Sequence, residues 1–207
     1  MHTRATWIQA SPDQVERLTA NFKEKVMPAA KKAKGYVGAT LLYDRDKQQG
    51  IGITIWESGR ALVESEEVGV ATRTQAAAET AARIVNVDRG EVVLMDRAAP
   101  PAVPGFTRAN MAYCDPGKLD ELIAMIRDKV VPILRQQKGY RSTWMTVDRT
   151  SGLTTTMTVW DSAADREASN AAISPLREEA ARLMGSAVRV ELGEQLAVEL
   201  LAPVPAG

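Results

Sequence analysis

The side chains best placed for chemistry are two tryptophans at the ends of strand-like segments. Trp56 and Trp160 each follow an alternating segment, and their same-face neighbours include Thr54 and Thr158. A tryptophan offers a planar ligand a flat apolar wall with one N–H donor, so either ring could bind a ligand. The same residue can instead fill the core between a sheet and a helix, and both interpretations stay open.

Amide, phenol and thiol groups form a second set of candidates. Asn110 and Tyr113 share one strand-like segment and could hydrogen-bond a ligand oxygen, although buried asparagines more often bond protein backbone because an unsatisfied amide is costly. Tyr140 could contact a ligand, but its counterpart Tyr36 favours a structural role at a turn. Cys114 lacks a histidine partner, which argues against a nucleophilic thiolate.

The remaining inventory disfavours several enzyme classes. His2 is the single histidine, so no histidine elsewhere can act as a general base near neutral pH. The sequence has no His or Cys cluster for a metal, no glycine-rich phosphate loop and no Gly-x-Ser-x-Gly elbow. We therefore expect no metal and no cofactor, and a hydrolase, kinase or metalloenzyme is disfavoured.

An internal repeat organises the chain that must position these residues. Residues 3–58 realign without a gap onto residues 107–162 at a shift of about 104 residues, with about 17 of 56 positions identical. The repeated positions include Pro28 and Pro132, Lys34-Gly35-Tyr36 and Lys138-Gly139-Tyr140, Asp44-Arg45 and Asp148-Arg149, and Trp56 and Trp160. The copies differ at Thr40 and Trp144, which makes Trp144 a candidate ligand contact in the second copy.

Each copy predicts the same succession of elements. A strand over 4–9 leads to a helix capped at Ser11, where Gln14 can complete a capping box. Pro28 predicts a kink or an end in that helix, and Gly35 supplies the left-handed residue that often follows one.

A hairpin, a helix and closing strands complete each copy. The hairpin strands span 36–43 and 51–56 in the first copy, and an alanine-rich helical segment follows. Ser174-Pro175 predicts a restart of the later helix. Two strands then close each copy, over 83–87 and 91–95 in the first and over 187–192 and 195–201 in the second.

This order is the ferredoxin-like βαββαβ arrangement of an α+β fold, with an added strand. The helices cover one face of such a sheet, and a duplicated chain can bury the other face by pairing its two sheets. We expect a first unit over 1–97, a proline-rich linker over 98–105 and a second unit with a short tail over 106–207.

Composition limits the partners and the compartment. Lys plus Arg and Asp plus Glu both number 26, without a long basic run, which argues against nucleic acid as a partner. No apolar run approaches the roughly 20 residues of a membrane span, and the first residues lack a signal-peptide pattern. A single cysteine suits a reducing compartment, so we expect a cytoplasmic protein with no membrane partner.

The succession of a proline-kinked helix, a Gly-Tyr turn, a hairpin and a Trp-Glu-Ser or Trp-Asp-Ser end resembles the antibiotic-biosynthesis monooxygenase family. The resemblance covers nearly the whole chain. It implies a dimeric α/β barrel, which most members build from two shorter chains and which this chain would build as a pseudo-dimer within itself. Two such chains could still associate as a homodimer.

The resemblance also implies an activity and a site. Members include cofactor-free oxygenases that convert polycyclic phenols or quinols to quinones, and relatives that bind and degrade haem. The tryptophan matching Trp56 or Trp160 lines their pocket, and the haem-degrading members carry a strand asparagine that Asn110 matches and Thr6 does not. Their haem-ligating histidine follows the tryptophan, whereas His2 lies outside that region.

Two functions from different classes follow. The first is a cofactor-independent monooxygenase acting on a small planar phenol or quinol, with Asn110, Tyr113 and Trp160 as catalytic residues and Trp56, Trp144 and Tyr140 as ligand contacts. These groups would supply orientation, desolvation and a donor to a developing oxyanion. The alternative is a non-catalytic small-molecule binding module of the same fold, and haem binding is a minor third alternative.

Overall fold

The computed structural model describes residues 1–200, and its chain divides into two compact units. The first unit comprises residues 1–89 and 102–104 together with residues 193–200. The second comprises residues 90–101 and 105–192. Neither unit is continuous in the sequence, because each receives the end of a strand that begins in the other.

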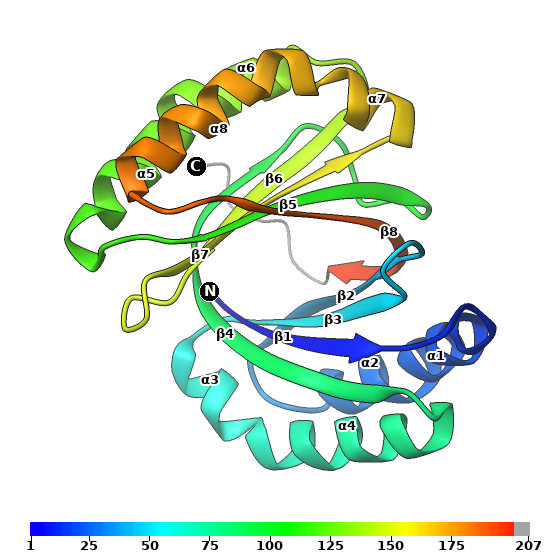
Figure 1. The fold of residues 1–207 in the computed structure, drawn as a ribbon. Coiled ribbons are helices and arrows are strands. Elements are labelled where there is room, and N and C mark those ends of the chain that lie inside the picture. The colour runs from blue at the N-terminus through cyan, green and yellow to red at the C-terminus, as the bar shows by residue number, and fades with distance from the viewer. Residues whose placement is uncertain (201–207) are drawn as a thin grey trace. The chain divides into compact units, whose positions relative to one another are not determined.

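The first unit is an antiparallel sheet with helices over one face (Figure 1). β1 pairs with β3, β3 pairs with β2, and the end of β8 pairs with β2. Its strands are β1 (His2–Gln9), β2 (Tyr36–Asp44), β3 (Gln49–Trp56) and the end of β8 (Arg189–Leu200). Its helices are α1 (Val15–Asn21), α2 (Met27–Lys31), α3 (Gly59–Glu64) and α4 (Glu66–Thr80).

The second unit repeats this arrangement. β5 pairs with β7, β7 pairs with β6, and the end of β4 pairs with β6. Its strands are β5 (Gly105–Tyr113), β6 (Tyr140–Val147), β7 (Leu153–Trp160) and the end of β4 (Arg83–Arg97). Its helices are α5 (Leu119–Met125), α6 (Val131–Arg135), α7 (Ala163–Ala168) and α8 (Asn170–Met184).

The strands β4 and β8 are each continuous, whereas the sequence predicted two strands in each place. Gly90 and Gly193, which fall between the predicted strands, lie inside them. An isolated glycine is tolerated within a strand at the cost of side-chain packing, so it need not end one. The hydrogen-bonded order β1-β3-β2-β8-β5-β7-β6-β4 is that of a closed barrel, which confirms the predicted α+β barrel class.

The proline kink is resolved as a π-helical turn in both units. Residues Phe22–Val26 form this turn before α2, and Ile126–Val130 form it before α6. Pro28 and Pro132 lie just after this turn, so the carbonyls four residues before them, which a proline ring clashes with and cannot bond, belong to the widened turn. The predicted kink therefore becomes a local widening of one long helical segment.

The capping box predicted at Ser11 forms, and serines also cap α3 and α7. The backbone N–H of Ser11 donates to Oε1 of Gln14 at 2.8 Å, as a capping box requires, and the Ser58 and Ser162 hydroxyls accept backbone N–H groups at 3.1 and 3.0 Å. The predicted restart at Ser174-Pro175 is wrong. A second helical segment does form, but α8 begins at Asn170, and Pro175 lies inside it, where the proline leaves one hydrogen bond to the preceding turn unmade.

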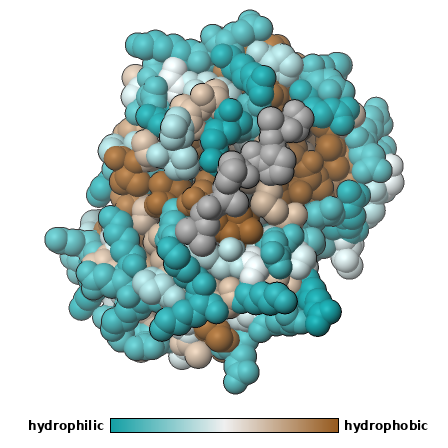
Figure 2. All heavy atoms as spheres, turned by 180° about the vertical axis from the view of Figure 1, so that it is seen from behind, coloured by the Kyte–Doolittle hydropathy of each residue, from teal (hydrophilic) through white to brown (hydrophobic). Residues whose placement is uncertain are grey.

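Each unit has its own hydrophobic core between sheet and helices. In the first core, Trp56 packs edge-on against Tyr36, with 5.9 Å between the ring centroids. In the second, Trp160 packs edge-on against Tyr140, with 5.7 Å between the ring centroids. The face in Figure 2 is mostly hydrophilic, with smaller apolar patches. Within residues 1–200, no helix is long and apolar enough to span a membrane.

Candidate functional site

Each unit contains a cavity between its sheet and its helices. The first has a volume of about 70 Å³ and the second about 50 Å³, so each can hold several water molecules or part of a small ligand. Residues that alternate along β1 and β5 face these cavities, because successive side chains in a strand point to opposite faces. The repeat relates their polar lining: Arg4 and Arg108, Thr6 and Asn110, Thr54 and Thr158, and Arg73 and Arg177.

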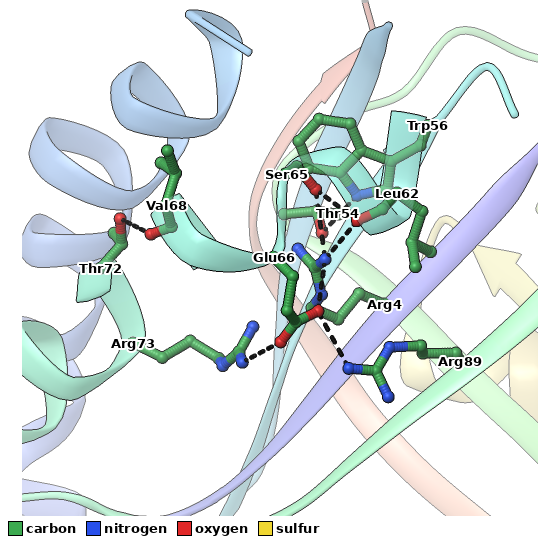
Figure 3. A network of polar contacts seen from close by, with 10 residues as sticks. All are labelled: Arg4, Thr54, Trp56, Leu62, Ser65, Glu66, Val68, Thr72, Arg73 and Arg89. Carbon is green, nitrogen blue, oxygen red and sulfur yellow. Dashed lines mark hydrogen bonds and ion pairs between the residues drawn. The ribbon is translucent and has the colours of Figure 1, made fainter. Parts of the chain in front are cut away.

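In the first unit, a carboxylate binds the arginines (Figure 3). Glu66, at the start of α4, accepts from Nη2 of Arg4 at 2.8 Å, of Arg73 at 2.8 Å and of Arg89 at 2.9 Å. The Arg4 guanidinium also donates to the Leu62 carbonyl at 2.7 Å and lies 5.7 Å from the centre of the Trp56 ring. Arg4 is therefore fixed by ionic, neutral and aromatic partners at once.

The charges of this network are strongly coupled. Burial alone would raise the pKa of Glu66, but hydrogen bonds from Arg73 and Arg89 and the charge of Arg4 outweigh it and lower the pKa to about 2. Burial lowers the pKa of Arg4, and the nearby Glu66 opposes that effect. The carboxylate thus offsets much of the cost of burying a guanidinium.

In the second unit, the repeat places Asn170 where the first unit has Glu66. The buried Arg108 guanidinium donates to Oγ of Ser169 at 2.9 Å and to the carbonyl oxygen of Arg166, both of which are neutral acceptors. Burial and the neighbouring charges of Arg177 and Arg166 lower the pKa of Arg108 to about 10. This arginine remains charged at neutral pH without the ionic partner that Arg4 has.

Arg177, the second arginine of this cavity, contacts the predicted site residue Asn110 and also Asn170. Its Nε donates to Oδ1 of Asn110 at 2.9 Å, and its Nη2 lies 3.4 Å from Oδ1 of Asn170. Burial lowers the pKa of Arg177, while the charge of the exposed Glu167 partly opposes this. With its oxygen engaged, Asn110 keeps its amide N–H₂ group as a donor for a ligand.

The two predicted tryptophans occupy different positions relative to the cavities. Trp56 lines the first cavity. Trp160 is fully buried, is not among the residues lining the second cavity, and donates its Nε1–H to Oγ1 of Thr158 at 2.9 Å. Thr158 does line that cavity, so Trp160 contacts a residue of the cavity wall without lining the cavity itself.

The other predicted residues lie outside the cavity lining. The Tyr140 hydroxyl donates to Oδ2 of Asp96 at 2.7 Å in the core. Tyr113 is 60% exposed, and Trp144 is half-buried on β6. Cys114 is buried, and burial raises the pKa of its thiol, which is the opposite of what a nucleophile requires.

The arginine pairs are the site residues that the sequence reasoning missed. Arg4 and Arg108 fall inside the repeated block, and Arg73 and Arg177 keep the same spacing beyond it. A basic residue recurring in the first strand of each copy, two positions before Thr6 or Asn110, was the available signal. Long charged side chains are rarely buried unless paired, so repeated strand arginines indicate a built polar site.

Comparisons by sequence find relatives without an assigned activity. No family model matches the chain. The uncharacterized protein Rv2557 of Mycobacterium tuberculosis is 27% identical over 196 residues, which cover 95% of this chain and 84% of that protein. The uncharacterized protein Rv2558 of the same organism is 30% identical over 148 residues, covering 72% of this chain and 62% of that protein.

Solved structures match the fold over nearly the whole chain. An anthrone oxidase-like protein has a TM-score of 0.68 at 14% identity, covering 99% of this chain and 95% of its own. A ferredoxin-fold protein related to antibiotic biosynthesis monooxygenases, from Listeria monocytogenes, has a TM-score of 0.56 at 10% identity, covering 93% and 94%. The haem-degrading enzyme LmHde of Listeria monocytogenes has a TM-score of 0.55 at 12% identity, covering 94% and 99%. The chain has the fold of the antibiotic biosynthesis monooxygenases, with both repeats in one polypeptide.

Proposed function

We propose that the protein is a cofactor-independent monooxygenase that oxidises a small planar phenol or quinol in the cavity of the second unit. The observation that carries the proposal is the composition of that cavity, where Asn110, Arg177 and the hydroxyl of Thr158 meet an otherwise largely apolar wall. Such a wall desolvates an aromatic ring, and a few fixed donors orient its oxygen. The fold shared with an anthrone oxidase-like protein supports this assignment.

The reaction needs no group beyond substrate and oxygen. A bound phenolate transfers one electron to O₂, and the resulting phenoxyl and superoxide radicals combine at a ring carbon to form a peroxide. Loss of the ring proton and cleavage of the O–O bond leave a quinone and hydroxide, so phenolate plus O₂ gives quinone plus hydroxide. The protein would supply desolvation, orientation and donors to the anionic oxygen.

Each residue has a role within this reaction. The Asn110 amide would donate to the substrate oxygen, while its own oxygen is held by Arg177. Trp160 would act as a positioning residue, because its N–H bonds the Thr158 hydroxyl at the cavity wall. A histidine ligand for haem iron is not among the residues lining this cavity, so the lining does not fit the haem chemistry of LmHde.

Oxygen uptake with anthrone and 1-naphthol tests the proposal. We expect substrate-dependent uptake with quinone formation, reduced at least tenfold in Asn110→Ala. The matched variant Thr6→Ala changes the equivalent position of the first cavity and should retain the rate. Absence of uptake above a protein-free control, or equal loss in both variants, would refute the assignment.

The binding-module alternative is favoured by a specific feature, the lack of a carboxylate or histidine among the residues lining the second cavity. Without a general base at the wall, the protein could bind an aromatic molecule and leave it unchanged. Saturable binding of 1-naphthol with no oxygen consumption would support this alternative.

A further inference from the structure

We infer that the second cavity is a binding site for the anionic group of a small aromatic molecule, a carboxylate or phenolate, held by Arg108 and Arg177. For phenols this rests on the proposed function and specifies the ionised form as the substrate. For carboxylates it is a binding site independent of any oxidation.

The first step of the argument is the burial of uncompensated charge. Arg108 is 2% exposed and lines the cavity, and its bonds go to a serine hydroxyl and a backbone carbonyl. Arg177 lines the same cavity and bonds two asparagine oxygens. A buried guanidinium bound only to neutral acceptors is costly, and an anion that reaches it forms the stronger, charge-assisted bonds.

The second step is the internal comparison with the first unit. There, Arg4 and Arg73 have the equivalent places, but Glu66 already accepts from both at 2.8 Å. The arginines that line the first cavity are therefore already paired with an anionic side chain of the chain itself. In the second unit the neutral Asn170 replaces that carboxylate, and the anion must come from a ligand.

The third step is the surrounding of the arginines. The lining between α5 and α8 is mostly aliphatic, including Leu122, Ile126 and Ile173, which suits an aromatic ring rather than a phosphate or a sugar. The exposed Glu167 opposes the positive charge only partly, and its Oε1 is engaged by the Asn170 amide at 2.7 Å. The cavity thus combines an apolar wall with a cationic end.

Calorimetric titration with benzoate and its neutral isostere benzamide tests the inference on the full chain. We expect one benzoate per chain, benzamide at least tenfold weaker, and at least tenfold weaker benzoate binding in Asn170→Asp. This substitution is isosteric and supplies the carboxylate that the first unit already has. Gln136→Glu adds the same charge at an exposed position and should leave binding unchanged.

A second pair of variants assigns the cavity. Arg177→Gln should weaken benzoate binding at least tenfold, whereas the equivalent Arg73→Gln in the first cavity should not. Equal binding of benzamide, full retention of binding in Asn170→Asp, or equal loss in Arg73→Gln would overturn the inference. Benzoate binding without oxygen uptake on phenols would refute the oxygenase and leave the anion site supported. Oxygen uptake on phenols together with undiminished benzoate affinity in Arg177→Gln would refute the anion site and leave the oxygenase supported.

Discussion

Replacing Glu66 by glutamine should destabilise the protein measurably at neutral pH. The substitution removes the charge that holds Arg4, Arg73 and Arg89 together and keeps the shape of the side chain. The pKa of Glu66 falls from the ordinary 4.5 to about 2, a difference that corresponds to about 3.4 kcal/mol at about 1.36 kcal/mol per pH unit. The side chain is 31% exposed, so solvent screening reduces this to about 2 kcal/mol.

The stabilisation that Glu66 provides should depend on pH. A carboxyl whose pKa is depressed in the folded state stabilises that state fully above its unfolded pKa. For Glu66 the contribution is complete above about pH 4.5 and is lost as the pH falls towards about 2. The difference between wild type and Glu66→Gln should therefore be constant from pH 6 to 8 and shrink steadily below pH 4.5.

Thermal unfolding followed by circular dichroism measures this difference. For a chain of this length, about 2 kcal/mol corresponds to a Tm lower by about 4–8 °C at pH 7. Glu64→Gln is the matched control, because Glu64 pairs with Arg60 and both side chains are largely exposed, so Tm should change little. A Tm change at pH 7 no larger than that of the control, or one that persists undiminished at pH 2.5, would refute the reasoning.

Three further predictions concern a glycine, a tyrosine and an arginine of the second unit. Gly139→Ala should lower the free energy of unfolding, measured by chemical denaturation, by more than Gly185→Ala does. Both glycines have positive φ, which costs about 1–2 kcal/mol for alanine. Only at Gly139 would the new Cβ lie 2.7 Å from a carboxylate oxygen, that of Asp165. Tyr140→Phe should lower the free energy of unfolding by about 1–2 kcal/mol in the same assay, because the Tyr140 hydroxyl bonds a buried carboxylate. Tyr36→Phe should leave the free energy of unfolding unchanged, because the Tyr36 hydroxyl is buried without a hydrogen-bond partner. Equal effects of the two substitutions would contradict this. Since Arg108 has a pKa of about 10, benzoate affinity measured by titration should be flat from pH 6 to 9 and fall above about pH 10, and a fall centred near pH 7 would exclude this arginine as the anion's partner.

The local structure was largely predictable because it depends on short-range signals. The capping serines, the prolines at 28 and 132, and the glycines at 35 and 139 each act through the backbone within a few residues. The continuity of β4 and β8 was not predictable in this way. Gly90 and Gly193 look like turn residues, and only strand pairing keeps the chain extended through them.

The candidate site was predictable only in part, for a similar reason. Asn110 was predicted because it matches the strand asparagine of the haem-degrading relatives, where the first copy has Thr6, and it lines the second cavity. The arginines were not among the predicted site residues, although Arg4 and Arg108 recur in the repeat just as Trp56 and Trp160 do. Whether Arg108 is compensated depends on a residue about 62 positions away in the sequence, which no local pattern reveals.

The two copies therefore differ most in what their shared arginines contact. Both units bury a strand arginine that bonds the helix serine and a backbone carbonyl, so this part of the network belongs to the fold. One further position, Glu66 in the first unit and Asn170 in the second, decides whether the guanidinium groups meet an internal carboxylate. A carboxylate that is covalently part of the chain competes with any anionic ligand at a high effective concentration. Under the anion-site inference, the carboxylate at this position makes the first set of arginines an internal ion-pair network, and the asparagine leaves the second set available to a ligand.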